Sequence, residues 1–186
     1  MLFLEEIWSR NFTNLFIAPL KLKEIIIALI FTALIRTLIG LVPAIILTAP
    51  LFGVSILELG FPLLLLFLSL YIFGITLGLL VSAGLIRFGP SFENIAWSSL
   101  FLLAPLGCIY YPIEILPNFF QIIAKGLPLV YIFDETRNIL LNGLVDYENL
   151  KQAYFLNFVY LTFGICLFYF SFLKARIKGT LINMGE

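Results

Sequence analysis

Two apolar runs in this sequence are too long to be the buried core of a soluble domain. Residues 25–49 are interrupted by a single charge, Arg36, and residues 59–83 carry no charge. Roughly 20 consecutive apolar residues are enough for an α-helix to cross the hydrocarbon layer of a membrane. Both runs therefore predict membrane-spanning helices.

Two more runs, residues 95–111 and 153–173, are candidates for further spans, and the first of these is short. The whole sequence is 62% hydrophobic and 12% charged, whereas soluble domains have about 45–50% and about 25%. We therefore predict an all-α integral membrane protein with four transmembrane helices, forming a single domain over residues 1–186.

Several classes of protein are disfavoured by what the sequence lacks. It has no histidine, and Cys108 and Cys166 both lie in apolar stretches, which disfavours a zinc site, histidine-based catalysis and a disulfide framework. Its net charge is zero, which disfavours nucleic acid as a partner. It has no G-x-x-x-x-G-K-[ST] phosphate loop, and its acidic start does not look like a signal peptide. We predict no catalytic residue, cofactor or metal.

Basic residues are distributed unevenly between the loops, which predicts the orientation in the membrane. If the N-terminus is cytoplasmic, only Lys125, Arg137 and Lys151 lie on the outer side. We therefore expect a multi-pass protein with both termini in the cytoplasm. The basic residues on the cytoplasmic side would be Arg10, Lys21, Lys23, Arg87, Lys174, Arg176 and Lys178.

Residues 4–16 precede the first span and predict an amphipathic helix on the cytoplasmic side, because their apolar side chains recur at helical spacing. Such a helix either lies in the headgroup layer, with Trp8 as an interfacial anchor, or docks a cytoplasmic partner. The candidate docking residues are Ile7, Trp8, Phe12, Leu15 and Phe16.

Residues 112–150, on the outer side, are too apolar for a solvated loop, yet prolines and acids interrupt them too often for a span. Broken helices at membrane depth occur only where protein or a water-filled cavity covers them. Within residues 113–143 we predict two short re-entrant helices, residues 115–125 and 129–141, although an ordinary surface loop stays possible.

Gly74, Gly78 and Ser82 recur every four residues in the second span. Small residues at this spacing allow two helix backbones to approach closely, although glycine is also tolerated generally in membrane helices. The motif indicates packing and carries no chemistry.

Arg36 lies near the middle of the first apolar run. It either snorkels to the inner edge of the membrane or faces protein, water or a substrate, and no acidic residue lies inside another span to pair with it. Asp134, Glu135 and Arg137 lie on the second outer helix. An ion pair or a polar rim at a pore mouth fits these three better than catalysis.

The stretch APLGCIYYPIEILPNFFQIIAKGLPLVYIFDETR, residues 104–137, resembles the membrane subunit of ABC transporters of the ABC-2 (type V exporter) family. That family commonly has a span ending in a P-L-x-G-x-x-Y-P-like run, followed by L-P, an apolar I-A-x-x-L-P-L segment and an acid-x-x-R ending. The matching residues here include Pro105, Gly107, Pro112, Pro117, Ile123, Pro128, Asp134 and Arg137.

The resemblance covers essentially the whole chain and implies a permease subunit of an ATP-driven exporter in a bacterial-type inner membrane. It implies two partners besides the bilayer, an ABC ATPase subunit docked on residues 5–24 and a second permease copy. In that family this region forms short outer helices, and we hypothesise that here they form an outer gate at Pro112, Pro117, Phe120, Ile123, Pro128, Glu135 and Arg137.

Members of that family usually have six spans, so we expect this chain to correspond to the C-terminal two-thirds of a permease, as a truncated, mis-started or split form. The alternative class is a secondary transporter or channel subunit that uses Arg36 at its binding site. A membrane-embedded enzyme acting on lipid is disfavoured by the lack of histidine.

Overall fold

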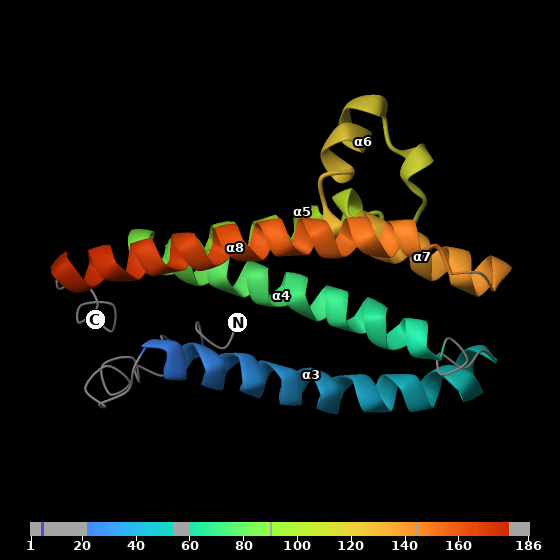
Figure 1. Cartoon of the computed structure of the whole chain (residues 1–186), viewed down its shortest axis with the longest axis horizontal. Helices are drawn as coiled ribbons and strands as arrows, with labels where there is room; N and C mark the ends of the chain where they lie inside the picture. Colours follow the sequence, from blue (N-terminus) through green and yellow to red (C-terminus); the bar gives the residue numbers. More distant parts are fainter. Residues whose placement is uncertain (1–4, 6–21, 54–59, 90, 144, 179–186) are drawn as a thin grey trace. The chain divides into compact units, whose positions relative to one another are not determined.

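The computed structural model describes residue 5 and residues 22–53, 60–89, 91–143 and 145–178. All regular secondary structure in these residues is helical, which confirms the all-α class (Figure 1). The elements are α3 (Leu22–Phe52), α4 (Phe61–Phe88), α5 (Phe92–Leu106), the 3-10 helix η2 (Ile113–Ile115), α6 (Asn118–Ala124), α7 (Pro128–Asn142) and α8 (Tyr147–Lys178).

Three helices in the described residues are long and apolar enough to cross a membrane, over Ile26–Thr48 in α3, Phe61–Phe88 in α4 and Tyr147–Ile177 in α8. They correspond to the runs predicted over residues 25–49, 59–83 and 153–173. α5 has 15 residues, so it is about 22 Å long, short of the roughly 30 Å hydrocarbon layer. The span predicted over residues 95–111 therefore remains a prediction.

The helix predicted over residues 4–16 lies almost wholly outside the described residues. Only Glu5 is described there, and it is helical. The proposed docking residues Ile7, Trp8, Phe12, Leu15 and Phe16 are not among the described residues, so their role stays a prediction.

Proline and glycine set the limits of the two short outer helices. Pro117 directly precedes α6, and Pro128 is in the first turn of α7, where a missing N–H costs no helical hydrogen bond. Gly143 ends α7 with a left-handed φ of 67°, and its N–H donates to the Ile139 carbonyl over 2.9 Å. Both segments predicted to be helical therefore contain a helix; their entry into the membrane remains a prediction.

The chain divides into two compact units. Unit 1 comprises Met1–Ile56, Gly78–Phe92 and Cys166–Glu186, and unit 2 comprises Leu57–Leu77 and Glu93–Ile165. The core of unit 1 is formed by α4 and α8, through Ala83, Leu85, Ile86, Phe168, Phe172 and Ala175. Unit 2 has two clusters, one of Leu66, Ile132, Leu150 and Ala153 and the other of Cys108, Ala124 and Val130. The predicted outer segment thus packs its buried residues within unit 2.

Candidate functional site

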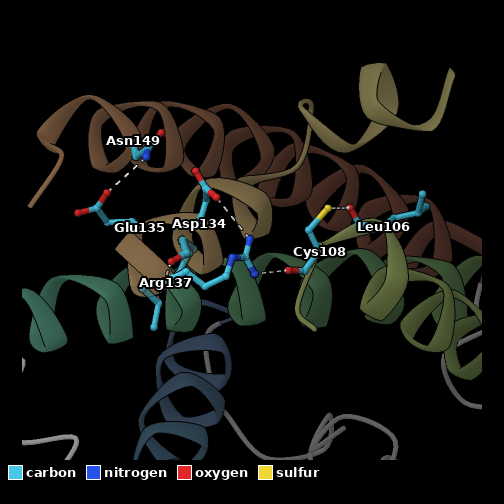
Figure 2. A network of polar contacts seen from close by, with 8 residues as sticks. Leu106, Cys108, Asp134, Glu135, Arg137 and Asn149 are labelled. Carbon is cyan, nitrogen blue, oxygen red and sulfur yellow. Dashed lines mark hydrogen bonds and ion pairs between the residues drawn. The ribbon is translucent and has the colours of Figure 1, made fainter. Parts of the chain in front are cut away.

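The polar contacts of unit 2 gather where its helices break, and Arg137 on α7 is central to them. Its Nη1 donates a 2.8 Å hydrogen bond to the carbonyl oxygen of Cys108, and its Nη2 lies 3.5 Å from Oδ1 of Asp134. Figure 2 shows the guanidinium group between these two oxygens. Cys108 is buried and has a φ of 53°, which is uncommon for a residue other than glycine. Arg137 thus ties the turn after α5 to α7.

Glu135 is fully buried, and its carboxyl group joins α7 to the start of α8. Oε1 accepts the backbone N–H of Asp146 over 2.7 Å, and Oε2 accepts the side-chain amide of Asn149 over 3.3 Å (Figure 2). Asp146 in turn accepts the N–H of Glu148 with its own side chain. Carboxyl groups are favoured at the start of a helix, where N–H groups have no partner within the helix. Glu135 therefore faces inward, whereas the sequence suggested a place at the water boundary.

Side-chain donors cover the carbonyl oxygens of the broken segment. Tyr111 Oη donates to Pro105 over 2.8 Å, and Gln121 Nε2 donates to Leu116 over 2.7 Å. Two more carbonyls, in the turn after α6, accept hydrogen bonds from tyrosine hydroxyl groups. Because an unpaired carbonyl in hydrocarbon costs several kcal/mol, this satisfaction makes the segment compatible with a place out of water.

One face of α8 is bound to α4 by polar side chains. Asn157 Nδ2 donates to the carbonyl oxygen of Ser69 over 3.0 Å and to its Oγ over 2.8 Å, and Tyr154 Oη donates to the Leu65 carbonyl over 2.8 Å. Asn157 and Ser69 are both buried. Hydrogen bonds of this kind hold membrane helices together, contributing about 0.6 kcal/mol on average. They fix α4 and α8 together within unit 2.

The residues of the predicted gate differ in exposure. Pro128 and Glu135 are buried and Arg137 is partly buried, whereas Pro112, Pro117, Phe120 and Ile123 are exposed. The buried and partly buried residues lie on α7, and the exposed ones lie in or before α6, whose one buried residue is Ala124. The gate itself stays a prediction.

In the small-residue motif on α4, Ser82 is buried, whereas the two glycines have open space beside them in the described chain. A Cβ atom built on Gly74 or on Gly78 would meet nothing within 4 Å, and Ser82 donates its hydroxyl to the Gly78 carbonyl of its own helix. Close packing in unit 1 occurs instead at Gly84, where a Cβ atom would overlap the ring of Phe92. The packing role of Gly74 and Gly78 stays a prediction.

Arg36 has an acidic partner, Glu5, which lies outside the predicted spans. Its Nη1 lies 2.6 Å from Oε2 of Glu5, and the side chains are 56% and 44% exposed. Glu5 lies in the N-terminal segment and not in a span. Arg36 thus forms an ion pair with an acidic residue of the N-terminal segment, and its role in the membrane stays a prediction.

Several of these donors were not predicted from the sequence, namely Tyr111, Gln121, Tyr131, Asn149, Asn157 and Tyr160. The available signal was a polar side chain in an apolar stretch, which must find a partner in a membrane protein. Among the described residues, no group of three or more His, Cys, Asp or Glu side chains could hold a metal ion. The polar contacts described above join helices and turns to one another.

The sequence profile of the ABC-2 type transporter family matches residues 1–141. The chain therefore belongs to the ABC-2 type transporter family, and it is a membrane permease whose family membership implies an ABC ATPase as partner. Neither a comparison with curated proteins nor one with solved structures gives a match.

Proposed function

We propose that this permease is an exporter subunit that provides part of a translocation pathway and is driven by a separate ATPase. The ATPase would dock on Ile7, Trp8, Phe12, Leu15 and Phe16, because aromatic residues on an amphipathic cytoplasmic helix are typical anchors of an interface. Two such permeases would pair in a bacterial-type inner membrane, with both termini in the cytoplasm. Gly74 and Gly78 are available for that pairing, since open space lies beside both in the described chain.

The observation that carries this proposal is the family match over residues 1–141. It includes the N-terminal segment and the broken outer segment through α7, which are the two parts given a role here. The satisfied carbonyls of residues 105–126 support a re-entrant position for α6 and α7. In that position the apolar side chains around α6 would close the outer mouth of the pathway and open it as the spans change state.

One experiment separates the docking role from the gating role. Trp8→Ala with Phe12→Ala should reduce recovery of the ATPase in a pull-down, with insertion of the permease preserved. Ile123→Lys should leave ATPase recovery intact but abolish ATP-dependent export in cells that carry this permease as the sole copy, because an unpaired charge in an apolar position is costly.

Asn118→Lys is the matched control, since Asn118 is an exposed polar residue of the same helix. It should preserve both ATPase recovery and export. Unchanged ATPase recovery in the double alanine variant would reduce residues 4–16 to a membrane anchor. Equal tolerance of lysine at positions 118 and 123 would make the outer segment a solvated loop.

A further inference from the structure

The turn between α6 and α7 contains two carbonyl oxygens that no backbone group satisfies. The N–H groups of Lys125, Gly126 and Leu127 donate to Gln121, Ile123 and Ala124, which completes the end of α6. In the described residues, no backbone N–H outside the helices donates to the oxygens of Lys125 or Gly126. These two oxygens therefore need side chains or water.

Two tyrosine hydroxyl groups fill this need. Tyr131 Oη, on α7, donates to the Lys125 carbonyl over 3.0 Å, and Tyr160 Oη, on α8, donates to the Gly126 carbonyl over 3.0 Å. The first contact stays within the outer segment, whereas the second crosses 34 positions of sequence to a spanning helix. The Tyr160 contact therefore connects the turn to α8.

The neighbours of Tyr160 hold its ring in place. The ring packs edge-to-face on Phe73 of α4, with centroids 6.4 Å apart and planes at 81°. Asn157 lies one turn earlier on α8 and is bound to Ser69, which fixes this face of α8 against α4. The hydroxyl group is thus presented to Gly126 by two helices that are already bound to each other.

Gly126 has little room for a side chain on the side of α6. A Cβ atom built there would lie 3.2 Å from the Ile123 carbonyl oxygen and 4.0 Å from the Tyr160 hydroxyl. A side chain at position 126 would therefore be crowded by α6, whereas its distance to the tyrosine is an ordinary van der Waals contact.

We propose that Tyr160 is the positioning residue of the outer helical hairpin formed by α6, the turn at residues 125–127 and α7. Its hydroxyl group latches the turn to α8, so that a displacement of α8 moves α6 with it. This inference rests on the proposed gate only for its consequence in export; the latch itself is a property of unit 2.

The test uses the full chain in membranes, with Cys108 and Cys166 replaced by alanine and one reporter cysteine at buried Ala124. The probe is a membrane-impermeant maleimide. Tyr160→Phe keeps the ring on Phe73 and removes only the hydroxyl group, so labelling at position 124 should become about tenfold faster as the unpaired carbonyl favours release of the turn. Tyr169→Phe, an exposed tyrosine of the same helix, should leave the rate unchanged.

A second reporter at Leu141, which is 82% exposed at the far end of α7, distinguishes local release from general loss of structure. The latch requires faster labelling at position 124 with an unchanged rate at 141. A parallel rise at both positions, or no rise at 124, would overturn it. If Tyr160→Phe releases the turn while Ile123→Lys leaves export intact, the latch is supported and the gate is contradicted. If Tyr160→Phe does not release the turn while Ile123→Lys abolishes export, only the latch is contradicted.

Discussion

α3 in unit 1 and α7 in unit 2 use polar side chains in opposite ways. In α3 no residue between Ile26 and Thr48 is buried, and Thr37 and Thr48 donate their hydroxyl groups to carbonyls of α3 itself. In α7 five residues are buried, including the polar Glu135. A long apolar helix satisfies its backbone alone and can stand in lipid, whereas a short helix between breaks depends on side chains from its neighbours.

This difference indicates which surfaces remain available. The large exposed side chains of α3 include Ile27, Phe31, Ile39, Ile46 and Leu51, and they suit contact with lipid or with another chain. Buried polar side chains of unit 2 such as Glu135 and Ser69 have hydrogen-bond partners within the unit, whereas Oδ1 of Asn157 has none among the described residues. We therefore expect substitutions in unit 2 to act through folding and position, and those on α3 to act through its surroundings.

The largest contrast should be in orientation, because labelling from one side of a membrane is nearly all or none. Exposed Leu141 belongs to unit 2 and exposed Ser91 to unit 1. The distribution of basic residues predicts that position 141 lies outside and position 91 in the cytoplasm. In the background lacking Cys108 and Cys166, an impermeant maleimide added to intact cells should label Leu141→Cys and spare Ser91→Cys. Labelling of position 91 alone would invert the topology.

How far the sequence predicts this fold depends on the range of the interaction. Run length located α3, α4 and α8, and Pro117, Pro128 and Gly143 marked the ends of α6 and α7, because these signals are local. The tie between Tyr160 and Gly126 spans 34 residues and that between Arg36 and Glu5 spans 31. One sequence carries no information on such pairs, so the sequence showed which polar residues need partners without identifying those partners.

A second contrast concerns stability, and Glu135 is the residue that tests it. Glu135→Ala removes the acceptor of two part-buried hydrogen bonds, from the Asp146 N–H and from the Asn149 amide. Leaving a fully buried donor unpaired costs about 1–3 kcal/mol, and water can reach these two donors in part, so we expect a total loss of about 1–3 kcal/mol and a lower Tm in detergent.

The matched control for this loss is Glu148→Ala, two residues after Asp146. Glu148 is 76% exposed and pairs with Lys151 on the surface of α8. Its replacement should leave the Tm unchanged, because surface ion pairs contribute little. A similar loss of Tm in both variants would mean that the hydrogen bonds of Glu135 contribute no more to stability than a surface ion pair. The contrast drawn between unit 2 and α3 would then be wrong.

The smallest effect should come from the pair on α3. Both Arg36 and Glu5 are about half exposed, so if the pair lies in the headgroup region, Glu5→Gln should cost less than about 1 kcal/mol. That small loss should shrink further in 1 M salt, where the Debye length falls to about 3 Å.

Glu6→Gln, which removes the same charge one position later, is the control for net charge. If Arg36 instead lies at the centre of the hydrocarbon layer, loss of its partner would leave a cation that costs about 2.5–3.5 kcal/mol on insertion scales. Recovery of inserted protein would then fall sharply for Glu5→Gln alone, independently of salt. That outcome would mean that Arg36 does not snorkel and requires Glu5 as a partner within the membrane. α3 would then depend on a polar partner from another segment, as α7 does.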